Sequence, residues 1–233
     1  MTPILECRDL CKRYGSVQAL DHINLRLEPG RIVGLLGPNG SGKTTLIKMA
    51  NGLLTWEHGD LLIDGMVPGA ATKSIVSYLP ERTYLSDWMT AAQTIDFFED
   101  FYPDFRRDRA EDMLLRLNVP LDRKIRQLSK GTREKVQLIL VMSRNASLYL
   151  LDEPIAGVDP VARDYILDTI IRAHNPDSSV LISTHLINDI EPVLNEVIMI
   201  KYGTLAVQGD ANELRKTFGK SLNDIFKEVF AGC

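Results

Sequence analysis

The chain has 233 residues, of which 45% are hydrophobic and 25% are charged. This composition is ordinary for a globular protein and supplies enough apolar side chains for one large domain, with room for a small inserted lobe. The formal net charge of −4 argues against a chain that binds nucleic acid through a strongly basic surface. No stretch approaches about 18 consecutive apolar residues, and the start lacks a signal-peptide pattern, so neither a membrane span nor a leader is expected.

Three cysteines, Cys7, Cys11 and Cys233, form no obvious disulfide framework and are expected to be reduced thiols of a cytosolic protein. Cys7 and Cys11 lie in a stretch that is predicted as strand and turn. No histidine or further cysteine lies near them in the sequence, so a metal site there is not expected.

The first third of the chain predicts strands followed by a helix. Residues 4–27 alternate apolar and polar side chains and are interrupted at Tyr14-Gly15, which is typical of antiparallel strands joined by turns. Residues 31–36 are a short apolar run that ends in glycine-rich sequence, which indicates a buried strand entering a loop. A helix is predicted over residues 43–54.

Between about residues 90 and 143 the pattern becomes helical. Helices are predicted over residues 91–102, 106–117 and 130–143, with prolines near the ends of the first two. In the third helix one stripe of the surface carries Val136, Ile139, Leu140 and Ser143.

The alternation of strands and helices then returns. Short apolar strands separated by helices indicate a mostly parallel sheet that is covered by helices. The expected elements are strands over 148–151 and 180–183, a helix over 161–173, a hairpin of 197–200 with 205–207, and a short amphipathic helix over 221–230.

Together these elements predict an α/β fold with a mostly parallel core sheet, an N-terminal antiparallel β-subdomain and an inserted α-helical subdomain. We expect a single domain over residues 1–233. Its core and β-subdomain would occupy about 1–85 and 144–220, the helical subdomain about 86–143, and a C-terminal helix 221–233.

A glycine-rich segment fits the pattern G-x-x-x-x-G-K-[ST] and lies between a predicted strand and a predicted helix. Its glycines let successive N–H groups curl around an anion, and the helix start adds its positive dipole end. Lys43 would reach the β- and γ-phosphates, the Thr44 hydroxyl would bind Mg²⁺, and Thr45 would add a phosphate contact. This loop alone leaves kinases, GTPases and ATPases open. Its residues are Gly37, Pro38, Asn39, Gly40, Ser41, Gly42, Lys43 and Thr44.

The strand predicted at residues 148–151 ends in two acids, Asp152 and Glu153. In an open α/β sheet, ligands bind beyond the carboxyl ends of the strands. Asp152 is therefore expected near the Mg²⁺ of the phosphate loop. Glu153 suits the polarisation of an attacking water as a general base.

Residues 128–132 read Leu-Ser-Lys-Gly-Thr, and with them the order of motifs resembles the ATP-binding subunits of ABC transporters over nearly the whole chain. The segment is similar to the signature of that family, usually written LSGGQ. Lys130 replaces a glycine and Thr132 the glutamine, whereas Ser129 and Gly131, which touch the γ-phosphate in the family, are present. A serine hydroxyl and free N–H groups at a helix start also suit an anion.

The resemblance assigns further positions. Tyr14 matches the aromatic residue that stacks on adenine, although an ordinary strand tyrosine is an alternative. Glu81 occupies the place of the usual Q-loop glutamine and can offer an oxygen to Mg²⁺. Residues 156–159 resemble the D-loop, and His185 matches the switch histidine that bonds the γ-phosphate. The remaining histidines are expected on the surface or in loops: His22, His58 and His174.

The resemblance therefore implies a P-loop NTPase of the ABC cassette type that binds ATP and Mg²⁺ and hydrolyses ATP. Lys43, Glu153 and His185 would be catalytic. The metal ligands would be Thr44, Glu81 and Asp152. In the family the signature of one cassette completes the phosphate site of another, so a homodimer or a heterodimer with a second cassette is expected, and no nucleic acid.

The implied partner is a separately encoded membrane-spanning permease, most like those of bacterial export systems. Such a partner would place the chain in the cytoplasm, on the inner face of the cell membrane. The segment around residues 84–88 is similar to the groove that receives a short permease helix, where Tyr84 and Trp88 would face the partner unless they are buried aromatics.

Two other functions are compatible with an ABC cassette or a nucleotide fold. One is a non-transport ABC ATPase that acts on ribosomes or DNA, which the single phosphate loop, single signature and absence of a heptad run disfavour. The other is a regulatory ATP-binding module without turnover, which the presence of Lys43, Asp152, Glu153 and His185 disfavours.

Overall fold

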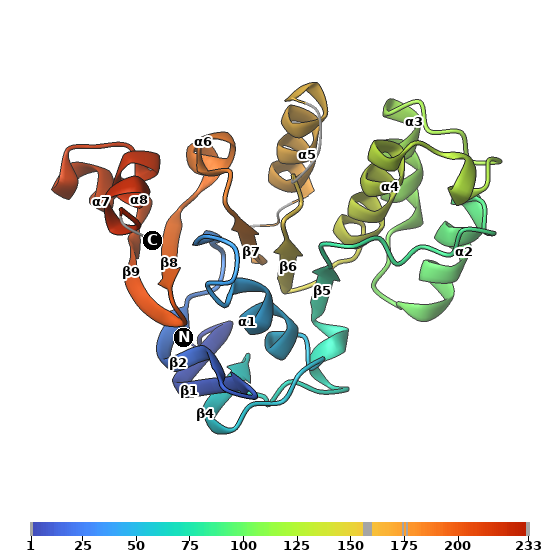
Figure 1. Ribbon diagram of the computed structural model, residues 1–233. Coiled ribbons are helices and arrows are strands. Elements are labelled where there is room, and N and C mark those ends of the chain that lie inside the picture. The colour runs from blue at the N-terminus through green and yellow to red at the C-terminus, as the bar shows by residue number, and fades with distance from the viewer. Residues whose placement is uncertain (1, 156–159, 174, 176, 232–233) are drawn as a thin grey trace.

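The computed structural model describes residues 2–155, 160–173, 175 and 177–231, which are organised around two β-sheets (Figure 1). The larger sheet has the strand order β5-β6-β7-β3-β8-β9. Four successive pairings from β5 to β8 are parallel and β9 joins antiparallel, so the predicted mostly parallel core sheet is confirmed. The strands are β3 (Ile32–Leu36), β5 (Val76–Leu79), β6 (Leu148–Asp152), β7 (Ser179–Thr184), β8 (Glu196–Lys201) and β9 (Thr204–Asp210).

The smaller sheet is the predicted antiparallel β-subdomain, with the order β2-β1-β4. Its strands are β1 (Leu5–Tyr14), β2 (Val17–Leu27) and β4 (His58–Ile63). The predicted turn falls at Gly15, whose φ of 57° suits glycine. Strand β1 pairs irregularly with β2, since register shifts occur between Cys7 and Arg13. Cys7 and Cys11 both lie within β1, so the prediction of a turn in this stretch is wrong.

Helix α1 (Lys43–Ala50) lies between the two sheets (Figure 1). Leu46, Ile47 and Met49 pack with side chains of β1, β2 and β3 in one hydrophobic core. The helix is shorter than the predicted 43–54, because the N–H groups of residues 51–53 fold back onto its last turn and Gly52 has a φ of 67°.

The inserted helices form a lobe beside the larger sheet: α2 (Ala91–Phe101), α3 (Arg107–Arg116), the 3₁₀ turn η2 (Ile125–Gln127) and α4 (Lys130–Met142). Each α-helix ends within one residue of its prediction. Thr90 and Gln93 form a capping box at the start of α2. Helix α4 belongs to two cores, because Val136, Ile139 and Leu140 pack within the lobe whereas its Leu138, Val141 and Met142 pack against the larger sheet.

Arg144, directly after α4, connects the lobe to the larger sheet. Its buried guanidinium donates to the carbonyl oxygens of Val76 at 2.6 Å and Ser74 at 3.0 Å. It also pairs with Asp104 at 3.1 Å and lies 4.0 Å from the centre of the Tyr102 ring. A buried charge is tolerated here because its N–H groups have carbonyl and carboxylate acceptors and an aromatic ring lies over the guanidinium.

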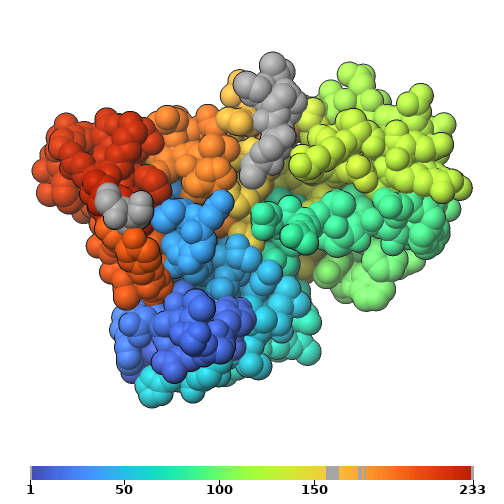
Figure 2. Space-filling model, in the orientation of Figure 1, coloured from blue at the N-terminus to red at the C-terminus, as the bar shows by residue number. Residues whose placement is uncertain are grey.

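The C-terminal part contributes α5 (Pro160–Ala173), α6 (Ile187–Ile190), η3 (Glu191–Val193), α7 (Ala211–Phe218) and α8 (Leu222–Val229); η1 (Thr72–Ser74) precedes β5. Helix α7 was not predicted. Asp210 caps its start and Gly219, with a φ of 65°, ends it. In Figure 2 the β-subdomain, the helical lobe and the C-terminal helices project in three directions from the larger sheet. None of the helices in the described ranges combines the length and apolar character needed to cross a membrane.

Candidate functional site

The glycine-rich loop leaves the central strand β3 and ends where α1 begins, in the predicted strand–loop–helix context. A Cβ atom at Gly37 would lie 2.6 Å from the carbonyl oxygen of Ile200. At Gly42, whose φ is 112°, it would lie 2.5 Å from the carbonyl oxygen of Ala19. Both positions therefore require glycine, because the loop passes against backbone that cannot give way.

Lys43 is buried at the base of this loop. Its Nζ donates to the carbonyl oxygens of Gly37 at 2.8 Å and Pro38 at 3.1 Å, so the side chain bends back across the loop. Burial lowers the pKa of Lys43, against the opposing effect of Glu153, whose Oε1 lies 3.9 Å away. The ammonium group is thus held inside the curve of the loop, where an anion would meet it.

Asp152 ends strand β6 and is 1% exposed. Its Oδ1 accepts from the hydroxyl of Thr44 at 3.1 Å and from that of Ser183 at 2.6 Å. Its Oδ2 is buried and has no hydrogen-bond partner among the described residues. Burial is the main cause that raises the pKa of Asp152, and its two hydroxyl partners oppose it. The free lone pairs of a buried carboxylate beside the Thr44 hydroxyl fit a hard cation such as Mg²⁺.

Glu153 follows with a φ of 51°, which turns its side chain out of the strand direction. Its backbone N–H donates to both the carbonyl and the hydroxyl of Ser183, each at 3.1 Å. Its carboxylate lies 3.1 Å from Nδ1 of His185. The structure therefore brings Glu153, His185 and Lys43 together at the ends of neighbouring strands. Ser183 was not singled out from sequence; its place beside Asp152 follows from the register of β6 and β7.

Glu81 lies in the loop after β5 and is exposed. It lines one pocket together with Asp152, Glu153 and Glu134 of α4. Glu81 and Glu153 both contribute to the raised pKa of Asp152 by charge repulsion. Four carboxylates around one small pocket favour a cation there, and all of them offer oxygen ligands of the kind Mg²⁺ prefers.

Gln137 of α4 holds the loop that contains Glu81, and sequence reasoning missed it. Its side-chain oxygen accepts from the Thr83 hydroxyl at 2.8 Å and from the Tyr84 N–H at 3.1 Å. Its amide nitrogen donates to the carbonyl oxygen of Pro80 at 3.3 Å. The only sequence signal was a polar residue among the apolar side chains of α4. One buried amide thus links the helix that begins in the signature to the Glu81 loop.

Replacing Gln137 with leucine is expected to leave its three hydrogen-bond partners in the Glu81 loop without this amide. The free energy of unfolding should fall by about 1–3 kcal/mol. In a chain of this size that corresponds to a fall of roughly 2–12 °C in melting temperature. The control is Gln127→Leu, since Gln127 is exposed and its side-chain oxygen accepts only one bond in the described structure, from the Lys124 N–H. Equal melting temperatures for the two variants would show that the Gln137 bonds do not hold the loop.

The predicted adenine and signature residues lie on the surface. Tyr14 ends β1 with its ring exposed, and Nζ of Lys12 lies 5.3 Å from the ring centre. Ser129 caps α4 by accepting from the N–H of Thr132 at 3.2 Å. A Cβ at Gly131 would meet open space. Within the part of the chain that is described, no hydrogen bond or ion pair joins the signature to residues 37–45.

Several other expectations are resolved. Trp88 is 64% exposed and Tyr84 is also exposed, so neither is a buried aromatic. His22 and His58 are exposed as expected, on strands β2 and β4. The statement that no histidine lies near Cys11 is wrong in three dimensions, because the backbone N–H of His22 donates to the Cys11 sulfur at 3.3 Å. The D-loop residues 156–159 and His174 lie outside the described residues.

Comparisons with known proteins identify the family of the chain. A sequence model of the ABC transporter family matches residues 20–156, more than half of the chain. The ABC transporter ATP-binding protein YtrB of Bacillus subtilis (strain 168) is 32% identical over 220 residues, which cover 93% of this chain and 75% of that protein. The SkfA peptide export ATP-binding protein SkfE of the same organism is 32% identical over 208 residues, 87% of each protein.

Comparison of the fold with solved structures indicates the same family. A solved structure of an ATP-binding subunit of an ABC transporter superposes with a TM-score of 0.88 and 26% identity, over 97% of this chain and 99% of that one. Sequence, fold and the position of the phosphate loop therefore agree that the chain belongs to the ABC transporter family, as an ATP-binding subunit.

Proposed function

We infer that the chain binds ATP with Mg²⁺, hydrolyses it to ADP and phosphate, and uses this cycle to drive a membrane permease. The observation that carries the inference is the buried Asp152, whose Oδ2 is unpartnered while Oδ1 binds the Thr44 hydroxyl. A carboxylate held in this way next to a glycine-rich loop supports a phosphate-bound cation better than a structural ion pair. Mg²⁺, when bound, would neutralise phosphate charge through Thr44, Asp152 and Glu81.

The side chains of this chain bind the nucleotide and carry out the proton transfer. The loop N–H groups and Lys43 hold the β- and γ-phosphates. Glu153 accepts a proton from the attacking water as the γ-phosphorus–oxygen bond to ADP breaks. His185, whose Nδ1 already contacts the Glu153 carboxylate, positions that carboxylate and bonds the γ-phosphate. Tyr14, with its exposed ring, stacks on the adenine.

A second cassette completes the site in this proposal. Ser129 and Gly131 lie at the exposed start of α4 and have no bond to the phosphate loop of the same chain in the described structure. A helix start that carries a serine hydroxyl can bind an anion, and a phosphate bound in the loop of the same chain does not reach this one. The γ-phosphate bound by another copy, or by a related cassette, satisfies it, so ATP closes a head-to-tail dimer.

The permease would dock on the helical lobe. Trp88 and Tyr84 are exposed near α2, and Phe97 and Phe101 on that helix are exposed as well. Exposed aromatics in one region of a lobe are typical anchors of a protein interface. SkfE is named for peptide export, which supports an export-type permease and a place on the cytoplasmic face of the membrane.

The test is to purify tagged Glu153→Gln chain from its native cells in detergent with ATP, and to identify what co-purifies by mass spectrometry. Recovery of a multi-span membrane protein supports the transport function. Recovery of ribosomal proteins or DNA without a membrane protein would replace it with the non-transport alternative.

In the same experiment, a second change of Trp88→Ala is expected to reduce recovery of the membrane protein on the order of 10-fold, because tryptophans are frequent interface hot spots. The ATPase rate of the isolated Trp88→Ala chain should stay close to that of the wild type. The matched control is Phe218→Ala, since Phe218 is 47% exposed on α7, away from the helical lobe (Figure 1). Undiminished recovery with Trp88→Ala would place the permease elsewhere.

A further inference from the structure

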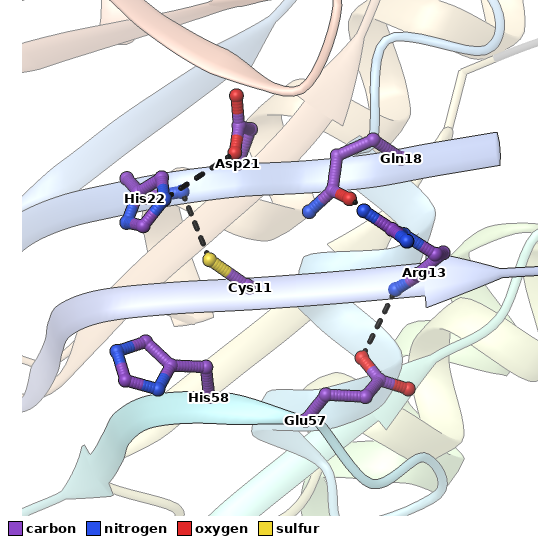
Figure 3. A pocket seen from close by; sticks show the side chains of 7 residues that line it. All are labelled: Cys11, Arg13, Gln18, Asp21, His22, Glu57 and His58. Atoms are coloured by element: carbon purple, nitrogen blue, oxygen red, sulfur yellow. Dashed lines mark hydrogen bonds and ion pairs between the residues drawn. The ribbon is translucent and has the colours of Figure 1, made fainter. Parts of the chain in front are cut away.

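A second polar site lies in the β-subdomain, made of residues that the proposed nucleotide chemistry does not use. Strands β1, β2 and β4 there form a pocket of about 370 Å³ that Cys11, Asp21, His22 and His58 help to line. Figure 3 shows these side chains on three neighbouring strands, with the Cys11 sulfur directed toward β2. Residues separated by up to 47 positions in sequence thus share one surface.

Three different metal-ligand types converge in this pocket. One ligand atom from each of Cys11, Asp21 and His22 lies within 4.8 Å of the other two. Nε2 of His22 is 3.8 Å from Oδ1 of Asp21, close to the edge of a tetrahedron whose metal–ligand bonds are about 2.0–2.3 Å. Small side-chain adjustments would bring all three atoms to bonding distance of one ion.

Asp9 orients the histidine for this role. Its Oδ1 lies 2.5 Å from Nδ1 of His22, and its Oδ2 lies 2.9 Å from Nε2 of His58. A histidine whose Nδ1–H bonds a carboxylate presents its Nε2 outward, and metal-bound histidines nearly always have such a partner. The supporting shell of a metal site is therefore present together with the ligands.

The irregular backbone of β1 and β2 makes this convergence possible. His22 has a φ of 49° and Asp9 a φ of 55°, and register shifts in β1 occur on both sides of Cys11. The N–H of His22 donates to the Cys11 sulfur, which holds the sulfur beside the histidine. A regular strand would direct alternate side chains to opposite faces.

We propose that Cys11, Asp21 and His22 bind a divalent transition metal of the Zn²⁺ class, with the fourth position open to water. A thiolate and an imidazole select such a metal over Mg²⁺, whose ligands at the nucleotide site are all oxygens. The thiol and any imidazole proton would be released on binding, and the two negative ligands would balance the charge of the ion. The metal would tie β1 to β2 three residues before Tyr14.

Co²⁺ titration of the full chain tests the site, because Co²⁺ replaces Zn²⁺ in such sites and absorbs in the near ultraviolet when bound by a thiolate. The wild type is expected to bind one Co²⁺ with this absorption, and Zn²⁺ should displace it. Cys11→Ser should abolish the absorption. His22→Asn should weaken Co²⁺ affinity at least 10-fold, since asparagine tolerates the same φ but lacks Nε2.

Two matched variants control for the other thiols. Cys7→Ala removes a buried cysteine of the same strand, and Cys233→Ser removes the remaining one; both should keep the absorption. Thermal melts and ATP binding establish that each variant is folded, and if Cys11→Ser is unfolded then His22→Asn decides. The proposal is overturned if the wild type shows no thiolate absorption, if Cys11→Ser keeps it, or if folded His22→Asn binds Co²⁺ as tightly as the wild type.

Discussion

Glu153→Gln is expected to lower ATP turnover on the order of 10²-fold or more, while ATP still binds. The glutamine keeps the size of the side chain and its contact with His185 but cannot accept a proton from water. In the wild type, the backbone positions the Glu153 carboxylate for that step. A φ of 51° at Glu153 and two hydrogen bonds from its N–H to Ser183 fix this end of the strand. The measurement is phosphate release under saturating ATP, together with an independent ATP-binding assay.

Glu81→Gln is the matched control, since Glu81 lines the same pocket, the change removes the same charge, and the amide keeps an oxygen that can bind Mg²⁺. It should keep turnover within a few-fold of the wild type. Near-normal hydrolysis by Glu153→Gln would remove Glu153 from the role of base. In solution, Glu153→Gln with ATP should also accumulate as a dimer, and a monomer of unchanged size would argue against closure by a second cassette.

Gly42→Ala is expected to weaken ATP binding on the order of 10²-fold. An added Cβ would lie 2.5 Å from the Ala19 carbonyl oxygen and 2.7 Å from Leu20 Cδ2, at a φ of 112° that L-residues rarely adopt. Left-handed backbone alone costs about 1–2 kcal/mol, and the backbone clash adds to it, so the loop must leave its binding conformation. Each 1.4 kcal/mol of free energy needed to restore that conformation weakens ATP affinity by about a factor of ten.

Gly219→Ala separates the two causes. Gly219 also has a positive φ, 65°, but its added Cβ meets open space at the end of α7. This variant should lose about 1 kcal/mol of stability and keep its ATP affinity. If Gly42→Ala binds ATP as well as Gly219→Ala does, the close approach of the loop to β2 does not control the site.

The sequence predicted the local structure around the candidate site, because this structure depends on neighbours along the chain. The phosphate loop needs a strand, glycines and a helix in succession, and its surroundings are as expected. The acids at 152 and 153 follow a continuous apolar run, which identifies the strand end directly. The helices of the lobe were located to within a residue since their apolar periodicity and flanking prolines are explicit.

Other features depend on which strands become neighbours, and no local pattern records this. Ser183 meets Asp152 only because β6 and β7 pair in one register. Gln137 meets the Glu81 loop only because α4 packs against β5. Cys11 and His22 were judged separately, and the irregular pairing of β1 with β2 unites them. Helix α7 was missed because it is short and mostly polar, so that Ala211, Leu214 and Phe218 are its only apolar side chains.

The strand order also constrains how the protein is made. Strand β3 and its phosphate loop are synthesised early, but both flanking strands, β7 and β8, come from the last quarter of the chain. Until about residue 184 has left the ribosome β3 has no partner strand, and until about residue 201 it lacks the second one, so part of its apolar surface stays uncovered. The nascent chain therefore gains its capacity for ATP at one late step, and a ribosome that stalls before that step leaves a fragment with the complete motif and no nucleotide site.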